Sequence, residues 1–226
     1  MFKILISIVC MMFFTSSLYA HGSYGAKLCA DPRYDCINVK RGDSWRSLFP
    51  NEYEREIVRK VNRMNVGLTS GMRIAVPKNL RSVDFLSLAP FDRRIEPQPS
   101  TLIKVDLNNL AWGAYNPLGE LVNWGPVSGG QNYCSDINRG CRTVTGTFRI
   151  ERKQGAGCIS SRFPRPNGGA PMPYCMHFHG GYALHGSNTV PGHNASHGCV
   201  RLFTEDAQWL NQSFISVGRT IVKIFR

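Results

Sequence analysis

The chain has 226 residues, of which 42% are hydrophobic and 19% are charged. This is enough apolar material for one sizeable core and a smaller companion domain, and it excludes a wholly disordered chain. Basic residues outnumber acidic ones by 27 to 15, so the protein suits acidic polymers or lipids as partners, although a solvated basic surface with no dedicated partner has the same composition. The chain has no aromatic and basic module of the kind that binds nucleic acid.

The N-terminus has the order of a secretory signal. Lys3 precedes an apolar run from Ile4 to Phe14, and small and polar residues follow up to Ala20. The run is too short to span a bilayer comfortably. We therefore expect residues 1–20 to be a cleaved signal peptide and the protein to be exported, with a retained N-terminal anchor as the alternative. Export also argues against nucleic acid as a partner.

The cysteines give an odd count after export. Of the eight cysteines, Cys10 leaves with the signal peptide and seven remain. In an oxidising compartment six of them can pair. Proximity in the sequence suggests the pairs Cys29–Cys36, Cys134–Cys141 and Cys158–Cys175, which leaves Cys199 alone. A leftover cysteine can be a buried thiol or form an intermolecular bridge, so its local sequence must decide.

Residues 37–78 carry the pattern of a small βααβ unit. A short strand around 36–40 leads to a helix that Asp43 or Ser44 can cap. A second helix fits residues 54–62, where apolar residues recur at helical spacing, and Gly71 turns the chain into a strand over 72–76. The sequence therefore predicts a separate small domain before the larger one.

This order, with Gly-Asp-Ser-Trp at 42–45 and Gly-Met-Arg-Ile-Ala-Val-Pro at 71–77, resembles a LysM module. The resemblance implies that loops at one end bind glycan strands containing N-acetylglucosamine. A small α+β spacer in which Trp45 belongs to the core, or a degenerate module that no longer binds glycan, is the alternative.

Residues 79–99 lose periodicity and end in Pro97-Gln98-Pro99, which is typical of a semi-rigid linker. Beyond it, turn residues separate apolar runs, which predicts a mainly β domain over 100–226 with a hairpin-built, mostly antiparallel sheet. One helix is expected from Thr204, as its cap, to Asn211. The expected strands are 101–106, 111–116, 120–126 and 147–152.

Residues that can carry chemistry concentrate between positions 182 and 202. A thiol becomes a useful nucleophile as the thiolate, and a neighbouring imidazole is the ordinary means of forming one near neutral pH. His185 ends one apolar strand and Cys199 begins another apolar stretch, so two adjacent strands can bring them together. Gly198 leaves the backbone N–H groups beside Cys199 able to turn toward a developing oxyanion.

His185-Gly186 followed by Ser-His-Gly-Cys-Val-Arg-Leu at 196–202 resembles the signature of the YkuD-type L,D-transpeptidase catalytic domain. The resemblance extends to Thr-Val-Thr-Gly-Thr-Phe at 143–148 and Pro-Met-Pro-Tyr at 171–174, so it covers most of residues 100–226. Two positions depart from the family pattern. Val144 replaces a proline, and Cys175 replaces an aromatic residue, which suggests a disulfide that tethers a loop over the cleft.

The resemblance implies a β-rich domain in which Cys199 attacks, His185 accepts its proton, and His197 with Ser196 shapes the pocket. It also implies that the N–H groups of Gly198 and Cys199 bind the oxyanion. The remaining residues assigned to the substrate site or its loop are Gly186, Arg201 and Tyr174. The implied partners are peptidoglycan stem peptides and glycan strands, with carbapenem-type β-lactams as inhibitors and no cofactor.

Alternatives remain at this point. A zinc site from Cys175, His177, His179 and His185 is chemically possible, although the expected disulfide consumes Cys175. His177, His179 and His193 are otherwise expected in loops or at the rim. The chain lacks the cysteine signature and the cysteine-before-histidine order of papain-like peptidases. A hydrolase or D-amino-acid exchange enzyme on the same domain, or an inactive wall-binding protein, is the other function to separate.

Overall fold

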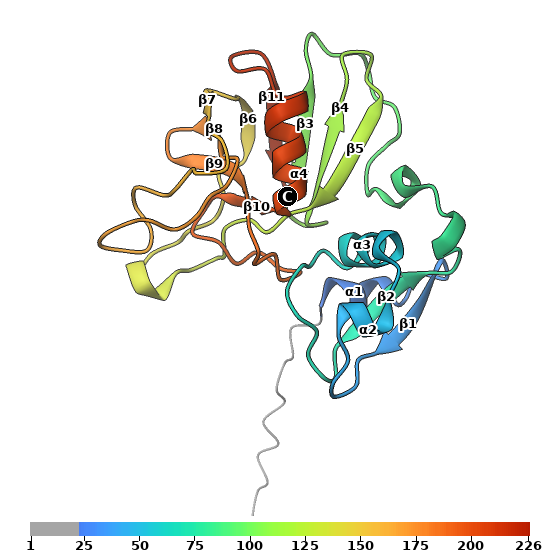
Figure 1. The fold of residues 1–226 in the computed structure, drawn as a ribbon. Coiled ribbons are helices and arrows are strands. Elements are labelled where there is room, and N and C mark those ends of the chain that lie inside the picture. Colours follow the sequence, from blue (N-terminus) through green and yellow to red (C-terminus); the bar gives the residue numbers. More distant parts are fainter. Residues whose placement is uncertain (1–22) are drawn as a thin grey trace, which may run out of the picture.

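The computed structural model describes residues 23–226 (Figure 1). The expected signal peptide and Cys10 lie outside these residues. Within residues 23–226, no helix has both the length and the apolar character needed to cross a bilayer. The described chain forms an N-terminal module (residues 24–78) and a C-terminal domain (residues 100–226), joined by a connecting segment (residues 79–99).

The N-terminal module has the predicted βααβ order, closed by an antiparallel pair of strands. Ser44 caps the first of its two central helices in a reciprocal capping box with Ser47, and Asn51 caps the second. A further short helix packs beside the second strand, so the module begins earlier than the predicted residue 37. The elements are α1 (Tyr24–Leu28), β1 (Tyr34–Asn38), α2 (Trp45–Leu48), α3 (Glu52–Val61) and β2 (Arg73–Pro77).

Trp45 belongs to the core of this module. Its side chain is buried among Val39, Val58 and Ile74, and its indole N–H donates to the carbonyl of Val66 at 2.8 Å. A tryptophan held in this way is not available to stack on a sugar ring.

The C-terminal domain is built on two sheets, in keeping with the predicted mainly β fold. The first has the strand order β5-β4-β3-β11-β6, and the second has the order β10-β9-β8-β7. The bounds are β3 (Leu102–Asp106), β4 (Ala111–Tyr115), β5 (Leu121–Pro126), β6 (Gly146–Arg149), β7 (Arg152–Lys153), β8 (Met176–His179), β9 (Tyr182–Gly186), β10 (Val200–Leu202) and β11 (Ile221–Phe225).

Most neighbouring strands are antiparallel, as expected from the hairpins, but each sheet contains one parallel pair. The C-terminal strand β11 runs parallel to β3 in the first sheet, and β10 runs parallel to β9 in the second. Strands β3 and β11 are distant in the sequence, whereas β9 and β10 are consecutive and joined by the loop 187–199, which crosses over in place of a hairpin turn.

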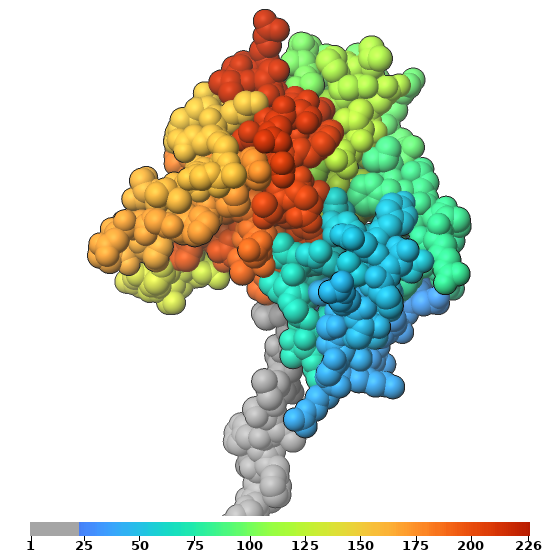
Figure 2. Space-filling view, viewed as in Figure 1, coloured from blue at the N-terminus to red at the C-terminus, as the bar shows by residue number. Residues whose placement is uncertain are grey.

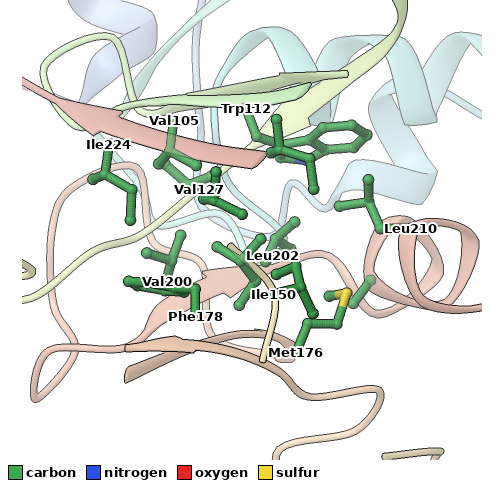
Figure 3. Packing of buried hydrophobic residues seen from close by; sticks show 14 of the residues in the cluster. Val105, Trp112, Val127, Ile150, Met176, Phe178, Val200, Leu202, Leu210 and Ile224 are labelled. Carbon is green, nitrogen blue, oxygen red and sulfur yellow. The ribbon is translucent and has the colours of Figure 1, made fainter. Parts of the chain in front are cut away.

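The main core lies between the two sheets, where the alternation of strand side chains brings apolar residues from each sheet face to face (Figure 3). Val105, Trp112 and Ile224 project from the first sheet. Phe178 and Leu202 project from the second. The opposite face of the second sheet is therefore free to carry polar groups.

Helix α4 (Thr204–Trp209) follows β10 and continues as a π-helical turn, η4 (Leu210–Phe214). Its N-cap is Phe203 and makes no side-chain cap bond, so the prediction of Thr204 as cap was wrong by one residue. Glu205 and Asp206 do lie in the first turn, where their charge meets the positive end of the helix dipole.

The connecting segment packs along the first sheet. It contains two short 3₁₀ turns, η1 (Leu80–Ser82) and η2 (Phe85–Leu88). The ring of Phe85 stacks on Trp124 of β5, whose indole N–H donates to the carbonyl of Phe85 at 2.8 Å. Later in the segment, Ile95 bonds to the turn between β4 and β5. The segment therefore lacks helical or strand periodicity, the feature that suggests a linker, because it follows the edge of the first sheet.

Candidate active site

The parallel pair of β9 and β10 sets the geometry of the site. In this register Arg201 lies opposite His185 and Val200 lies opposite Leu184. Leu184 and Val200 belong to the main core, so alternation places His185 and Arg201 on the other face of the sheet. Cys199 directly precedes Val200 and continues that face. The two-strand arrangement expected from the sequence is thus present, with Cys199 and His185 as diagonal neighbours.

The three disulfides are those expected from the sequence, with Cα–Cα distances of 5.7, 6.0 and 6.1 Å. Among residues 23–226, Cys199 is the free cysteine. It packs against a small cluster formed by the Cys158–Cys175 disulfide, Met172 and Ala183. The disulfide therefore fixes the loop over residues 155–173 directly beside the thiol.

The thiol of Cys199 is a protonated group at rest. Burial raises its pKa, while a backbone hydrogen bond from Ala183 and the positive charge of Arg201 act in the opposite direction. The sulfur donates to the carbonyl of Gly181 at 3.6 Å. The proton thus points along the β8–β9 hairpin before any substrate is bound.

His185 is a neutral imidazole with a defined tautomer. Its Nδ1 lies 2.8 Å from the carbonyl oxygen of Gly186, and a carbonyl only accepts, so Nδ1 carries the proton and Nε2 is left as the basic nitrogen. Burial lowers the pKa of His185 to about 4, because charging the ring would be costly there. Within residues 23–226 no hydrogen bond joins His185 to Cys199, so the thiol must rotate from Gly181 before proton transfer.

The tetrapeptide from Ser196 to Cys199 forms a tight turn closed by one hydroxyl. Ser196 Oγ accepts from the N–H of Gly198 at 3.0 Å and donates to the carbonyl of Cys199. Gly198 has φ of +124°, and a Cβ there would come within 2.8 Å of the Tyr182 ring. Glycine is therefore required both by the backbone and by the neighbouring aromatic side chain.

Two backbone N–H groups, those of Gly198 and Cys199, were expected to bind an oxyanion, and the turn uses one of them for its own hydrogen bond. The N–H of Gly198 is already taken by Ser196, whereas the N–H of Cys199 has no hydrogen-bond partner in the part of the chain that the structure describes. A free backbone N–H beside the nucleophile is suitably placed to stabilise negative charge on an attacked carbonyl.

His197 lies between two loops at the rim. Its Nε2 lies 2.9 Å from both carboxylate oxygens of Asp136, which belongs to the turn η3 (Ser135–Ile137) inside the Cys134–Cys141 loop. The ring of Phe163, from the Cys158–Cys175 loop, lies 4.7 Å away. The hydrogen bond to His197 lowers the pKa of Asp136. Two disulfide-closed loops thus hold this histidine.

The other predicted site residues divide into two groups. Arg201 is at the site, and its Nη1 donates to the carbonyl of Thr189 at 3.3 Å. Gly186 supports it, because a Cβ there would meet Thr204 Cα at 3.0 Å and its carbonyl orients His185. Tyr174 is half-buried, packs against the main core cluster and directly precedes Cys175, and its role in substrate binding stays a prediction.

Comparison with known proteins settles the family. Residues 100–224, more than half of the chain, match the sequence model of the YkuD L,D-transpeptidase catalytic domain. The chain belongs to this L,D-transpeptidase family. No curated protein matches it.

The fold is that of a solved L,D-transpeptidase structure, and further solved structures are similar over shorter stretches. An L,D-transpeptidase from Xylanimonas cellulosilytica is 21% identical, with a TM-score of 0.54 over 75% of this chain and 78% of that one. One from Stackebrandtia nassauensis is 23% identical with a TM-score of 0.48, covering 61% of each chain. A third, from Mycobacterium smegmatis, is 20% identical with a TM-score of 0.46 over 56% of this chain and 59% of that one.

The sequence reasoning gave no role in the transpeptidase site to three polar residues that the structure places there or beside it. Asp136 contacts His197 across a separation of 61 residues. Thr143 donates through its hydroxyl to the carbonyl of Gly198 at 2.8 Å, although its segment was part of the recognised pattern. His177 was expected in a loop or at the rim, but it lies in β8 with 8% of its surface exposed, opposite Ala183. In the sequence His177 alternates with the apolar residues Met176 and Phe178, and this pattern could have predicted its place in a strand.

The zinc site considered from the sequence lacks one of its four proposed ligands, because Cys175 forms a disulfide with Cys158. Among residues 23–226, the one group of three ligand-type side chains within 4.8 Å of one another is Cys134, Asp136 and His197. Cys134 is also in a disulfide and offers no thiolate. The transpeptidase domain therefore has a cysteine and histidine arrangement without a competing use for either residue.

Proposed function

We propose that this protein is an exported L,D-transpeptidase that forms peptidoglycan cross-links, or attaches protein to the wall, through a thioester on Cys199. The observation that carries the proposal is the shared sheet face of Cys199, His185 and Arg201 in a domain that matches the family. The substrate would be a stem peptide on a glycan strand. The protein would bind it in the periplasm, after residues 1–20 have been removed.

In the proposed reaction His185 Nε2 takes the thiol proton as Cys199 Sγ attacks the carbonyl carbon at the L-centre of the third residue. The N–H of Cys199 stabilises the oxyanion, and Arg201 favours the thiolate. The C–N bond then breaks and His185 returns the proton to the amine of the departing D-alanine. An amine of a second stem peptide attacks the thioester, forms the new amide and releases the thiol.

The lifetime of the thioester provides the test. Mature protein with a tetrapeptide donor should release D-alanine, and an acceptor peptide with a free side-chain amine should shift the product from tripeptide to cross-linked dimer. Tripeptide alone at every acceptor concentration would support a hydrolase. Neither D-alanine release nor a covalent adduct with a carbapenem on Cys199, by intact mass, would leave the inactive wall-binding protein.

We also propose that the N-terminal module binds glycan strands, on the basis of its LysM-like sequence and the basic charge of the chain. Intact protein should sediment with purified sacculi, and soluble N-acetylglucosamine oligomers should release it. Retention that responds to salt but not to the oligomers would instead support a general attraction between basic protein and acidic wall.

A further inference from the structure

The segment that follows α3 binds a loop of the transpeptidase domain through Asn65. Its Nδ2 donates to the carbonyl of Ser187 at 2.7 Å, and its Oδ1 accepts from the N–H of Val190 at 2.9 Å. Its own backbone N–H donates to the carbonyl of Val190 at 2.9 Å. One residue of the N-terminal module thus makes three hydrogen bonds to two residues, Ser187 and Val190, of one loop in the other domain.

The loop held by Asn65 connects the two reactive groups. It begins directly after Gly186 and leads toward the turn that ends in Cys199. Thr189, between the two residues that Asn65 contacts, accepts from Arg201 Nη1 at 3.3 Å. Asn65 therefore fixes the backbone on both sides of the carbonyl that holds the arginine beside the thiol.

The module is anchored firmly enough to act as a support. Lys60 of α3 forms a buried ion pair with Asp206 of α4, with 2.6 Å between Nζ and Oδ1. The guanidinium of Arg63 lies between the rings of Tyr24 and Trp124, at 4.8 and 4.7 Å. In Figure 2 the module and the transpeptidase domain meet in a continuous contact on the face shown. Several contacts of different kinds thus fix Asn65 relative to the sheet.

We propose that Asn65 is a positioning residue for the transpeptidase site, and that the N-terminal module is a structural part of that site in addition to any role in wall binding. The proposal rests on the function proposed above. Loss of the Asn65 side chain frees the 187–190 loop, and Arg201 then spends less time beside Cys199. The thiolate becomes less favourable, and the near-attack geometry becomes less populated.

The positive charge that lowers the pKa of the thiol belongs to Arg201 of β10, the strand that directly follows Cys199. Arg201 lowers the pKa of Cys199, whereas the histidines on the neighbouring strands of the same face, His185 of β9 and His177 of β8, have lowered pKa values and are neutral near pH 7. His197 belongs to the preceding turn and is held by Asp136. Displacement of Arg201 should therefore raise the apparent pKa of the thiol, which a change in overall stability alone would not do.

The experiment compares the full mature protein with Asn65→Ala, Asn65→Asp and a control, Tyr53→Ala, which changes an exposed residue of α3. Alkylation of Cys199 by iodoacetamide is followed by intact mass across pH, and D-alanine release from a tetrapeptide donor is measured on the same samples. In Asn65→Ala we expect alkylation at neutral pH to slow by about three-fold or more, as for a rise of half a pKa unit, with the same limiting rate at high pH.

Donor turnover should fall by roughly ten-fold in Asn65→Ala, mainly in kcat, because the loss is in positioning. Asn65→Asp, which keeps the acceptor for Val190 but loses the donor to Ser187, should lie between, and it carries the comparison if Asn65→Ala does not fold. Alkylation profiles that overlay those of wild type and Tyr53→Ala would overturn the proposal. Absence of D-alanine release in wild type would refute the proposed function, while the alkylation profiles would still decide the role of Asn65.

Discussion

The site has a floor and a rim, and each contributes a histidine of a different kind. The floor is the sheet face of β8, β9 and β10, where His185 is buried and bonded to the backbone of its own strand. The rim consists of the loops 132–141 and 155–173, each held by a disulfide, where the side chain of His197 is 30% exposed and depends on Asp136. The floor thus fixes the protonation state of His185, whereas the rim fixes the position of His197 through its contacts with Asp136 and Phe163.

The floor should be indispensable to chemistry. Cys199→Ala is expected to abolish D-alanine release, by more than about 10³-fold, because Cys199 is the free cysteine among residues 23–226 and the covalent step needs its thiol. The half-buried side chain is small, so the variant should fold, and its thermal unfolding and sacculus binding should match wild type. Residual turnover near the wild-type rate would place the nucleophile elsewhere.

His185→Ala should rank second, with acylation lowered by roughly 10²-fold through loss of the general base. The same residue predicts a pH effect on stability. Its pKa in the fold is about 4, below the ordinary value of 6.5, so the unfolded chain binds the extra proton first and stability falls as pH drops from about 6.5 toward 4.

Chemical unfolding of wild type and His185→Gln across this pH range measures the effect, and the glutamine variant should show a shallower decline. An equally steep decline in both proteins would assign the acid sensitivity to other groups. A smaller loss of turnover in His185→Ala than in His197→Ala would show that the floor and rim roles are reversed.

Gly198→Ala tests the turn that joins floor and rim. The new Cβ would lie 2.8 Å from Tyr182, at a backbone φ of +124° that non-glycine residues rarely adopt. We expect turnover to fall by about 10- to 50-fold and stability by about 1–3 kcal/mol. Adding Tyr182→Ala should recover part of the loss by removing the clash, while the backbone strain remains. Wild-type activity in Gly198→Ala would show that the turn does not need its observed shape.

The floor and the disulfides that close the rim loops were largely predictable from the sequence, and the side-chain contacts of the rim were not. Local signals sufficed for the strands that carry His185 and Cys199, for the disulfide pairs and for the order of elements in the module. The parallel pair of β3 and β11 and the contact of Asn65 with Val190 join segments that no periodicity relates. They are chosen by packing of the whole chain, which a single sequence does not display.

The same limit applies to individual residues and segments. Tyr174 was assigned to the substrate site by resemblance, and its packing against the edge of the main core could not be predicted from the sequence. Residues 79–99 lack helical or strand periodicity because their apolar side chains, such as Phe85 and Ile95, follow the edge of a sheet. Asp136 sits in a polar, exposed turn where nothing in the local sequence distinguishes it from other surface carboxylates.

The rim should show the smallest effect, and a double-mutant comparison can isolate it. Asp136→Asn removes the charge but keeps a hydrogen-bonding group, and His197→Ala removes the ring between Asp136 and Phe163. Each is expected to lower D-alanine release by less than about ten-fold, because neither group takes a proton from the thiol. If Asp136 acts only by holding His197, the double variant should be no slower than His197→Ala alone.

The pH dependence of the Asp136 contribution follows from its lowered pKa. The contribution is fully present above the ordinary pKa of an aspartate and is lost as pH falls through the lower value in the fold, so the deficit of Asp136→Asn should be constant near neutral pH. Turnover measured for the four proteins at fixed pH decides this point, and losses that multiply in the double variant would assign Asp136 a role independent of the histidine.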